Sequence, residues 1–304
     1  MRKSLLTVAV LSALASQVAF ADEAAAPAAA PTPTWTFPST IGVVSDYIWR
    51  GQTQTWGNPA VQAGIEVDHA SGAYAGIWGS NVSSKWLPNA TLEMDLSAGY
   101  RNTFATDFKY DLGAVYVYYP DGNFNKTAGQ GGAPLDSGYK NYGSSKLNTL
   151  ELYGSLGWKW FTVKAGVTPT KFYGWNTDNS GVPNAGPNHG GNFVGDVNAG
   201  VQKGGSTNGS YYYMASASYD LPMALNIAGE VGRQTIADST GLDWTWYKVG
   251  ATKSFDGTLA GWSVNAFYTG TTGSSAYKNF ASFEGVGSKT IDDKKVVVGI
   301  TKAF

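Results

Sequence analysis

Apolar and polar residues alternate with a period of two along most of this chain. Successive side chains of a β-strand point to opposite faces, so this period predicts strands with one apolar and one polar face. The pattern recurs in about twelve segments of about ten residues, at 41–50, 61–68, 73–82, 92–101, 110–118, 150–156, 161–167, 211–219, 225–231, 247–251, 262–268 and 296–304. The sequence therefore predicts an all-β chain.

The lengths of these segments and of their connections favour one kind of all-β fold. Strands of soluble proteins average 5–6 residues, whereas a tilted strand that crosses a bilayer needs about 9–11. Short connections near 68–72, 157–160, 220–223 and 255–260 alternate with long ones near 119–146, 169–209 and 270–293. Outer-membrane barrels have this asymmetry. We expect a transmembrane antiparallel up-and-down β-barrel of about twelve strands.

Composition supports the barrel over a soluble β-sandwich. Charged residues make up only 14% of the chain, against about 25% in typical soluble domains. The polar strand faces carry Gly, Ser, Asn and isolated charges instead of the Lys, Glu and Thr of a solvated sandwich face. Aromatic residues cluster near predicted strand ends, as in the girdles of membrane barrels; they are Tyr47, Trp49, Tyr74, Trp78, Tyr100, Tyr118, Trp158, Trp160, Trp244, Trp246 and Trp262.

The N-terminal residues 1–21 have the features of a secretory signal peptide. Arg2 and Lys3 precede an apolar stretch, which is too short to span a membrane as a helix, and Ala19-Phe20-Ala21 is a small-x-small cleavage site. Residues 22–36 form an Ala/Pro-rich leader, and 37–304 form the barrel. We expect export through the inner membrane to the outer membrane of a Gram-negative cell.

Two stretches and the C-terminus resemble known outer-membrane proteins. The final strand, 296–304, ends in Phe304 and resembles the signal read by the barrel-assembly machinery, although Lys302 departs from that pattern. The segments 45–52 (SDYIWRGQ) and 69–82 (HASGAYAGIWGSNV) resemble the TorF family of porins. The resemblance implies a channel without specifying its solute.

If the apolar faces meet lipid, the opposite faces line the barrel interior. The interior ionisable residues are then Asp46, Arg50, Glu66, Glu93, Asp95, Asp111, Glu151, Lys164, Glu230 and Lys248. Seven of these ten are acidic, which favours a weakly cation-selective pore. Arg50 is a candidate to lie between Glu93 and Asp95. The alternative is that these groups pair across strands and fill a narrow interior. The loop 169–209 is long enough to fold inward as a constriction.

Nothing in the sequence supports catalysis. The two histidines, His69 and His189, fall in connections at opposite ends of the predicted barrel, and no phosphate-loop, HExxH or GxSxG motif is present. The chain has no cysteine, and its net charge of -1 offers nothing to nucleic acid. We expect no enzyme activity, cofactor or metal site.

The predicted function is therefore passive diffusion of small polar solutes or ions, with outer-membrane lipid and the barrel-assembly machinery as partners. Two alternatives remain open at this stage. One is a plugged structural or adhesive barrel whose long loops, 120–146 and 169–209, bind a partner. The other is a conduit for a hydrophobic compound, suggested by the interior aromatic residues Tyr153, Tyr212 and Phe267.

Overall fold

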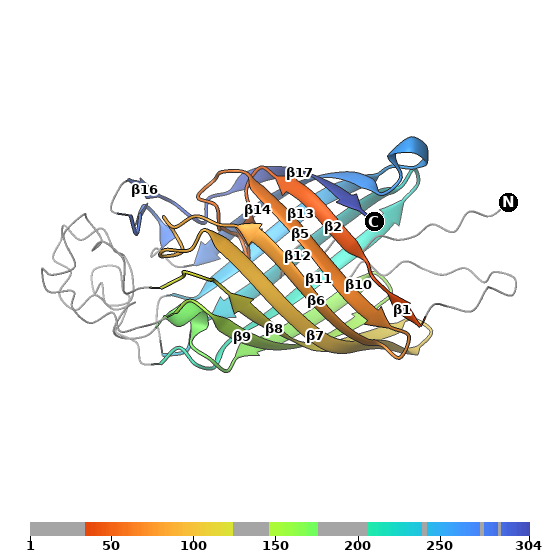
Figure 1. The fold of residues 1–304 in the computed structure, drawn as a ribbon, viewed down its shortest axis with the longest axis horizontal. Helices are drawn as coiled ribbons and strands as arrows, with labels where there is room; N and C mark the ends of the chain where they lie inside the picture. Colours follow the sequence, from red (N-terminus) through yellow and green to blue (C-terminus); the bar gives the residue numbers. More distant parts are fainter. Residues whose placement is uncertain (1–33, 124–145, 176–205, 239–241, 274–276, 285–286) are drawn as a thin grey trace, which may run out of the picture.

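The computed structural model describes residues 34–123, 146–175, 206–238, 242–273, 277–284 and 287–304. Twelve antiparallel strands close into a barrel, as the alternation predicts (Figure 1). They are β2 (Ser39–Val44), β5 (Ala60–His69), β6 (Ala73–Asn81), β7 (Leu92–Ala105), β8 (Phe108–Tyr118), β9 (Thr149–Trp158), β10 (Phe161–Thr168), β11 (Ser210–Leu221), β12 (Leu225–Thr235), β13 (Trp244–Ser254), β14 (Trp262–Gly273) and β17 (Lys295–Ala303).

The barrel closes at its N-terminal strands. β5 pairs with β6 on one side and with β2 on the other, and β2 pairs in turn with the C-terminal strand β17. The short strand β1 (Trp35–Thr36) pairs with the end of β5, at Asp68 and His69. Strand pairing therefore begins in the last two residues of the expected leader, 22–36. Phe304 is exposed beyond β17 and donates its backbone N–H to Ser39 O at 3.0 Å.

Short connections gather at one end of the barrel and long ones at the other (Figure 1). The short end holds tight turns, such as the one at Gly72, whose φ of +102° favours glycine. A Cβ on Gly72 would also collide with the carbonyl oxygen of Arg101. The short connection between β13 and β14 contains the 3-10 turn η4 (Gly257–Leu259).

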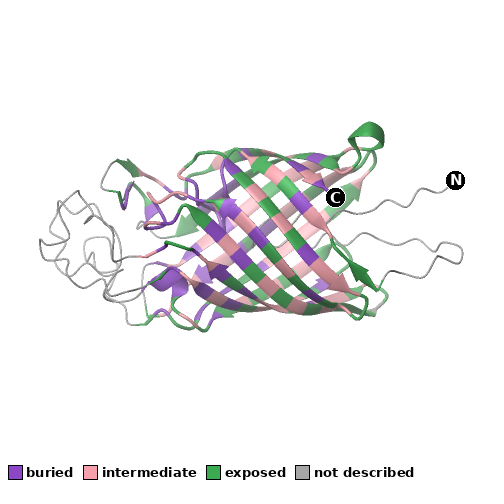
Figure 2. Cartoon of the chain, viewed as in Figure 1, coloured by how far each residue is buried: buried purple, intermediate pink, exposed green. Residues whose placement is uncertain are grey.

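The outer wall of the barrel is apolar. Leu112, Leu156 and Val163 are 58%, 55% and 42% exposed there, whereas most residues of the opposite parity are buried or half-buried (Figure 2). Apolar side chains therefore face outward and polar side chains face the interior, which is the reverse of the arrangement in a soluble protein. Among the described residues, no helix has the length and apolar character to cross a bilayer.

The expectation of two aromatic girdles is wrong for six of its eleven residues. Tyr100, Trp158 and Trp262 lie exposed on the outer wall, Trp160 is exposed in the turn between β9 and β10, and Tyr118 is half-buried. Six others are at most 7% exposed, namely Tyr47, Trp49, Tyr74, Trp78, Trp244 and Trp246. Proximity to a strand end is an insufficient guide, because a side chain of inward parity cannot reach lipid at any height.

The expectation of one continuous strand over 41–50 is also wrong. β2 ends at Val44, and residues 45–59 then turn into the barrel. This segment, which we call the strap, contains a hairpin of β3 (Ile48–Trp49) and β4 (Gln52–Thr53). The chain reverses at Arg50 and Gly51, whose φ values are +45° and +84°. The two-residue alternation could not reveal this reversal, because both strands of a short hairpin show the same alternation as one continuous strand.

Candidate functional site in the barrel interior

The strap is a compact unit held together by its own hydrogen bonds. Thr53 and Thr55 donate their hydroxyls to Asp46 Oδ1 at 2.5 and 2.9 Å, and Gln54 donates its backbone N–H to Tyr47 O at 2.7 Å. Lys295 of β17 lies 3.0 Å from the other Asp46 oxygen. Asp46 therefore ties the base of the strap to the wall from which it emerges.

The tip of the strap reaches across the barrel. Arg50 donates to Glu151 Oε2 on β9 at 2.8 Å and to Gln234 Oε1 on β12 at 2.5 Å. β9 is the fifth strand from β2 by the shorter way round, through β5, β6, β7 and β8. The opposite point of a twelve-stranded barrel is the sixth strand, so the strap nearly spans the interior. The expectation that Arg50 lies between Glu93 and Asp95 is wrong, because this crossing carries it to Glu151.

The Arg50–Glu151 pair is deeply buried, with side chains only 4% and 2% exposed. The guanidinium also lies 3.6 Å from the ring centroid of Tyr212 and 4.4 Å from that of Trp49. Removing one member of such a pair leaves the other charge buried and unpaired, which costs about 3–5 kcal/mol. The crossing therefore depends on both charges.

Glu93 and Asp95 project from β7 beside the strap. Tyr47 and Tyr119 donate their hydroxyls to Glu93 at 2.7 and 2.6 Å. Burial raises the pKa of both phenols well above the ordinary value, so they remain protonated donors. Among the described residues, Asp95 Oδ1 and Glu151 Oε1 are buried with no hydrogen-bond partner.

The remaining interior charges lie on the wall. Tyr74 donates to Asp111 at 2.8 Å, and Lys248 lies 3.2 Å from Glu230. Lys164 Nζ lies 3.6 Å from the centroid of the Tyr153 ring.

Two basic residues of the interior, Arg101 and Lys295, were not among the predicted interior residues. Arg101 pairs with Glu66 and, at 3.4 Å, with Asp68, while Lys295 pairs with Asp46. Both have the inward parity of their strands, so the same alternation could have found them.

Inward aromatic rings lie against glycines on neighbouring strands. Each of six rings is the direct cross-strand partner of a glycine, in the pairs Gly64–Trp78, Gly99–Tyr74, Gly113–Tyr153, Gly166–Tyr212, Gly232–Trp246 and Gly250–Phe267. A Cβ on Gly113, for example, would lie 2.7 Å from Tyr153 Cζ. The glycines therefore let bulky rings lie along the wall.

Buried residues gather at the end with long connections (Figure 2), and aromatic rings contact the strap there. Trp49 contacts Phe172 and Trp244, whose ring centroids lie 6.0 and 6.1 Å away. Phe172 belongs to η2 (Phe172–Gly174) of the expected constriction loop, of which residues 176–205 lie outside the described residues. The ring centroid of Tyr277 lies 5.3 Å from that of Trp244, and the ring centroid of Trp86 lies 4.9 Å from that of Phe280. Phe280 is the first residue of β15 (Phe280–Ala281), which pairs with β16 (Ser288–Lys289).

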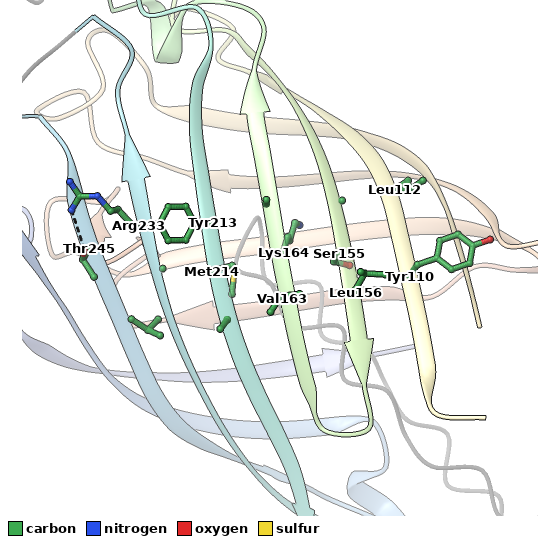
Figure 3. A pocket seen from close by; sticks show the side chains of 15 residues that line it. Tyr110, Leu112, Ser155, Leu156, Val163, Lys164, Tyr213, Met214, Arg233 and Thr245 are labelled. Carbon is green, nitrogen blue, oxygen red and sulfur yellow. Dashed lines mark hydrogen bonds between the residues drawn. The ribbon is translucent and has the colours of Figure 1, made fainter. Parts of the chain in front are cut away.

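A separate concavity of about 910 Å³ lies along the wall from β8 to β13 (Figure 3). Its lining includes the small residues Gly154, Ala165 and Ala215 between the larger Leu156 and Tyr213. These residues have the parity of the exposed outer wall, whereas Lys164 and Met214 of the same lining have the inward parity.

The histidine considered for catalysis lies at the short end of the barrel. His69 Nδ1 is 2.8 Å from Ser71 Oγ in an exposed turn, with the Trp35 ring 4.4 Å away. His189 lies outside the described residues.

Comparison with known proteins identifies a family. A family model described as a bacterial protein of unknown function (Gcw_chp) matches residues 28–304. This description does not carry the TorF name, so that resemblance stays a prediction. No curated protein matches the chain.

Solved porins resemble the chain distantly. A KdgM porin in complex with disordered oligogalacturonate is 9% identical with a TM-score of 0.45, over 88% of this chain and 98% of that one. The outer-membrane protein opdK from Pseudomonas aeruginosa is 13% identical with a TM-score of 0.37, over 90% of this chain and 68% of that one. Both likenesses are too distant to bear on what this chain does.

Proposed function

Because the chain belongs to the Gcw_chp family of bacterial proteins of unknown function, we propose its role from its own geometry. It is an outer-membrane barrel that lets small polar solutes or ions diffuse passively. The observation that carries this proposal is the contrast between an apolar outer wall and an interior lined by charged groups. An ionised Lys or Arg facing the bilayer midplane costs about 2–4 kcal/mol, and Asp or Glu less, so the charged face belongs to the interior.

The strap makes the interior a constricted path. Arg50, Glu151 and Gln234 join opposite parts of the wall, and solute passes beside this crossing. The acidic residues Glu93 and Asp95 lie near it and favour cations. Lys295 and Arg101 offset part of the acidic excess, so the preference for cations is weak.

A second candidate is a closed barrel that conducts nothing and displays its long loops. The aromatic residues that cover the strap favour it, because Trp49, Trp244 and Tyr277 fill space at the long-connection end. A hydrophobic conduit has less support. Tyr212 stacks on Arg50, while Tyr153 and Phe267 lie against glycines, so these rings are engaged by the protein itself.

Planar-bilayer recording of the purified protein decides between the two candidates. The channel predicts discrete conductance steps and, under a salt gradient, a small reversal potential of the sign expected for cations. A correctly folded barrel without any steps would overturn the channel and favour the closed barrel. Steps with an anion preference would refute only the argument from interior carboxylates.

A further inference from the structure

We propose that the strap is a gate, held across the barrel by Arg50 and released when Arg50 separates from Glu151 and Gln234. This inference rests on the proposed channel function. Its basis is that the base and the tip of the strap are attached differently. The base continues β2 and is tied to β17 through Asp46 and Lys295, whereas the Arg50 side chain anchors the tip to the far wall.

The strap has the internal bonding of a unit that can swing without unfolding. Ile48 pairs with Thr53, Trp49 pairs with Gln52, and the threonine hydroxyls bond to Asp46. These bonds lie within the strap and survive a movement about its base. Hydrogen bonds to residues outside the strap must break or follow when it moves. Thr53 donates its N–H to Ile291 O at 2.8 Å, Ser83 donates its N–H to Gln54 O at 2.9 Å, and Trp244 donates its indole N–H to Arg50 O at 2.8 Å.

The closed position leaves two carboxylate oxygens unsatisfied. Asp95 Oδ1 and Glu151 Oε1 are buried without hydrogen-bond partners among the described residues, and release would expose them to water. The positive φ of Arg50 has no part in this, because it belongs to the two-residue turn of the β3–β4 hairpin and is kept when the hairpin moves as a unit. The Arg50–Glu151 charge pair opposes release, so Glu151 is the point at which to test the gate.

The first test compares single-channel recordings of Glu151→Gln with the unaltered protein. The substitution keeps the shape of the side chain and removes the charge that holds Arg50. We expect open probability to rise at least about tenfold, with larger conductance steps. Glu66→Gln is the matched control, because it removes a carboxylate whose partner, Arg101, lies on the wall away from the strap. An open probability unchanged by Glu151→Gln would overturn the gate and leave a fixed constriction.

The second test does not depend on conductance. The chain has no cysteine, so Gln52→Cys places a single thiol on the strap, at a side chain only 1% exposed. A membrane-impermeant thiol reagent should label it at least about tenfold faster when Glu151→Gln is also present, and not when Glu66→Gln is. Equal labelling rates in correctly folded proteins would overturn strap movement. Faster labelling in a protein that never conducts would support strap movement while refuting the channel.

Discussion

Tyr153 lies over Gly113, its direct partner across β9 and β8, so closely that a Cβ on the glycine would be 2.7 Å from Tyr153 Cζ. The Tyr153 hydroxyl lies 2.5 Å from that of Tyr74, which donates to Asp111. One missing side chain thus permits an aromatic ring, a hydroxyl pair and a buried carboxylate to meet from β9, β8 and β6, across the intervening strand β7.

Gly113→Ala should destabilise the barrel by about 1–3 kcal/mol, the usual cost of forcing atoms into a packed interior. The added methyl displaces the Tyr153 ring and weakens its contact with Tyr74. Denaturant unfolding in lipid vesicles, followed by tryptophan fluorescence, measures the loss. Gly229→Ala is the control, because its nearest neighbour is a carbonyl oxygen 3.5 Å from the added Cβ. Equal stability of the two variants would contradict the role given to the glycine.

Ile77→Arg tests whether the outer wall meets lipid. Ile77 is the middle residue of β6, is 39% exposed, and lies between its cross-strand partners Ile65 and Leu96. A charge there should cost about 2–4 kcal/mol in a bilayer, whereas Phe108→Arg at the start of β8 should cost at most about 1. The same unfolding measurement applies. Equal costs at the two positions would argue against a membrane-facing wall.

Arg50→Lys should weaken the strap although the charge is kept. A lysine ammonium cannot reproduce the planar fork that reaches both Glu151 and Gln234, nor its stacking on Tyr212. A lost hydrogen bond to a charged group costs about 1.5–3 kcal/mol. Arg233→Lys is the control, because its side chain is 41% exposed where it pairs with Asp243. If Arg50→Lys and Arg233→Lys lower the unfolding free energy equally, a special role for Arg50 is contradicted.

Neutralising Glu93 and Asp95 together should reduce cation preference. In the variant Glu93→Gln with Asp95→Asn, one of the hydroxyls of Tyr47 and Tyr119 can donate to the amide oxygen and the other can accept from the amide N–H, so packing is retained while charge is lost. The reversal potential under a salt gradient should move toward zero, most clearly at low ionic strength. Asp256→Asn, in an exposed turn at the short end, should leave it unchanged. A potential insensitive to the double substitution would place the selective groups elsewhere.

The N-terminal prediction is checked by mass. Cleavage after Ala21 should yield a mature chain beginning at Asp22 in protein extracted from outer membranes. Ala19→Arg should block cleavage, because the small-x-small site is lost, and the precursor should then accumulate. An intact N-terminus in mature protein would refute the signal peptide.

Much of the barrel could be read from the sequence because pleating is a local property. Alternation at 92–101 assigns Leu96 to the outer wall and Asp95 to the interior without knowledge of any other strand. Girdle residues were less predictable, since Trp78 and Trp158 both lie near strand ends and differ only in parity. The partner of each interior charge was less predictable still.

The sequence by itself indicated about twelve strands, their antiparallel succession and the face of each alternating segment that is apolar, because these follow from a two-residue period and from connection lengths. Only the tertiary structure decided that residues 45–59 leave the wall and that Arg50 meets Glu151, 101 positions away. The reversal at Arg50 and Gly51 preserves alternation, so the pattern cannot register it. The Arg50–Glu151 pair forms only in the closed barrel, where pairing of β2 with β5 and β17 brings the opposite wall within reach of the strap.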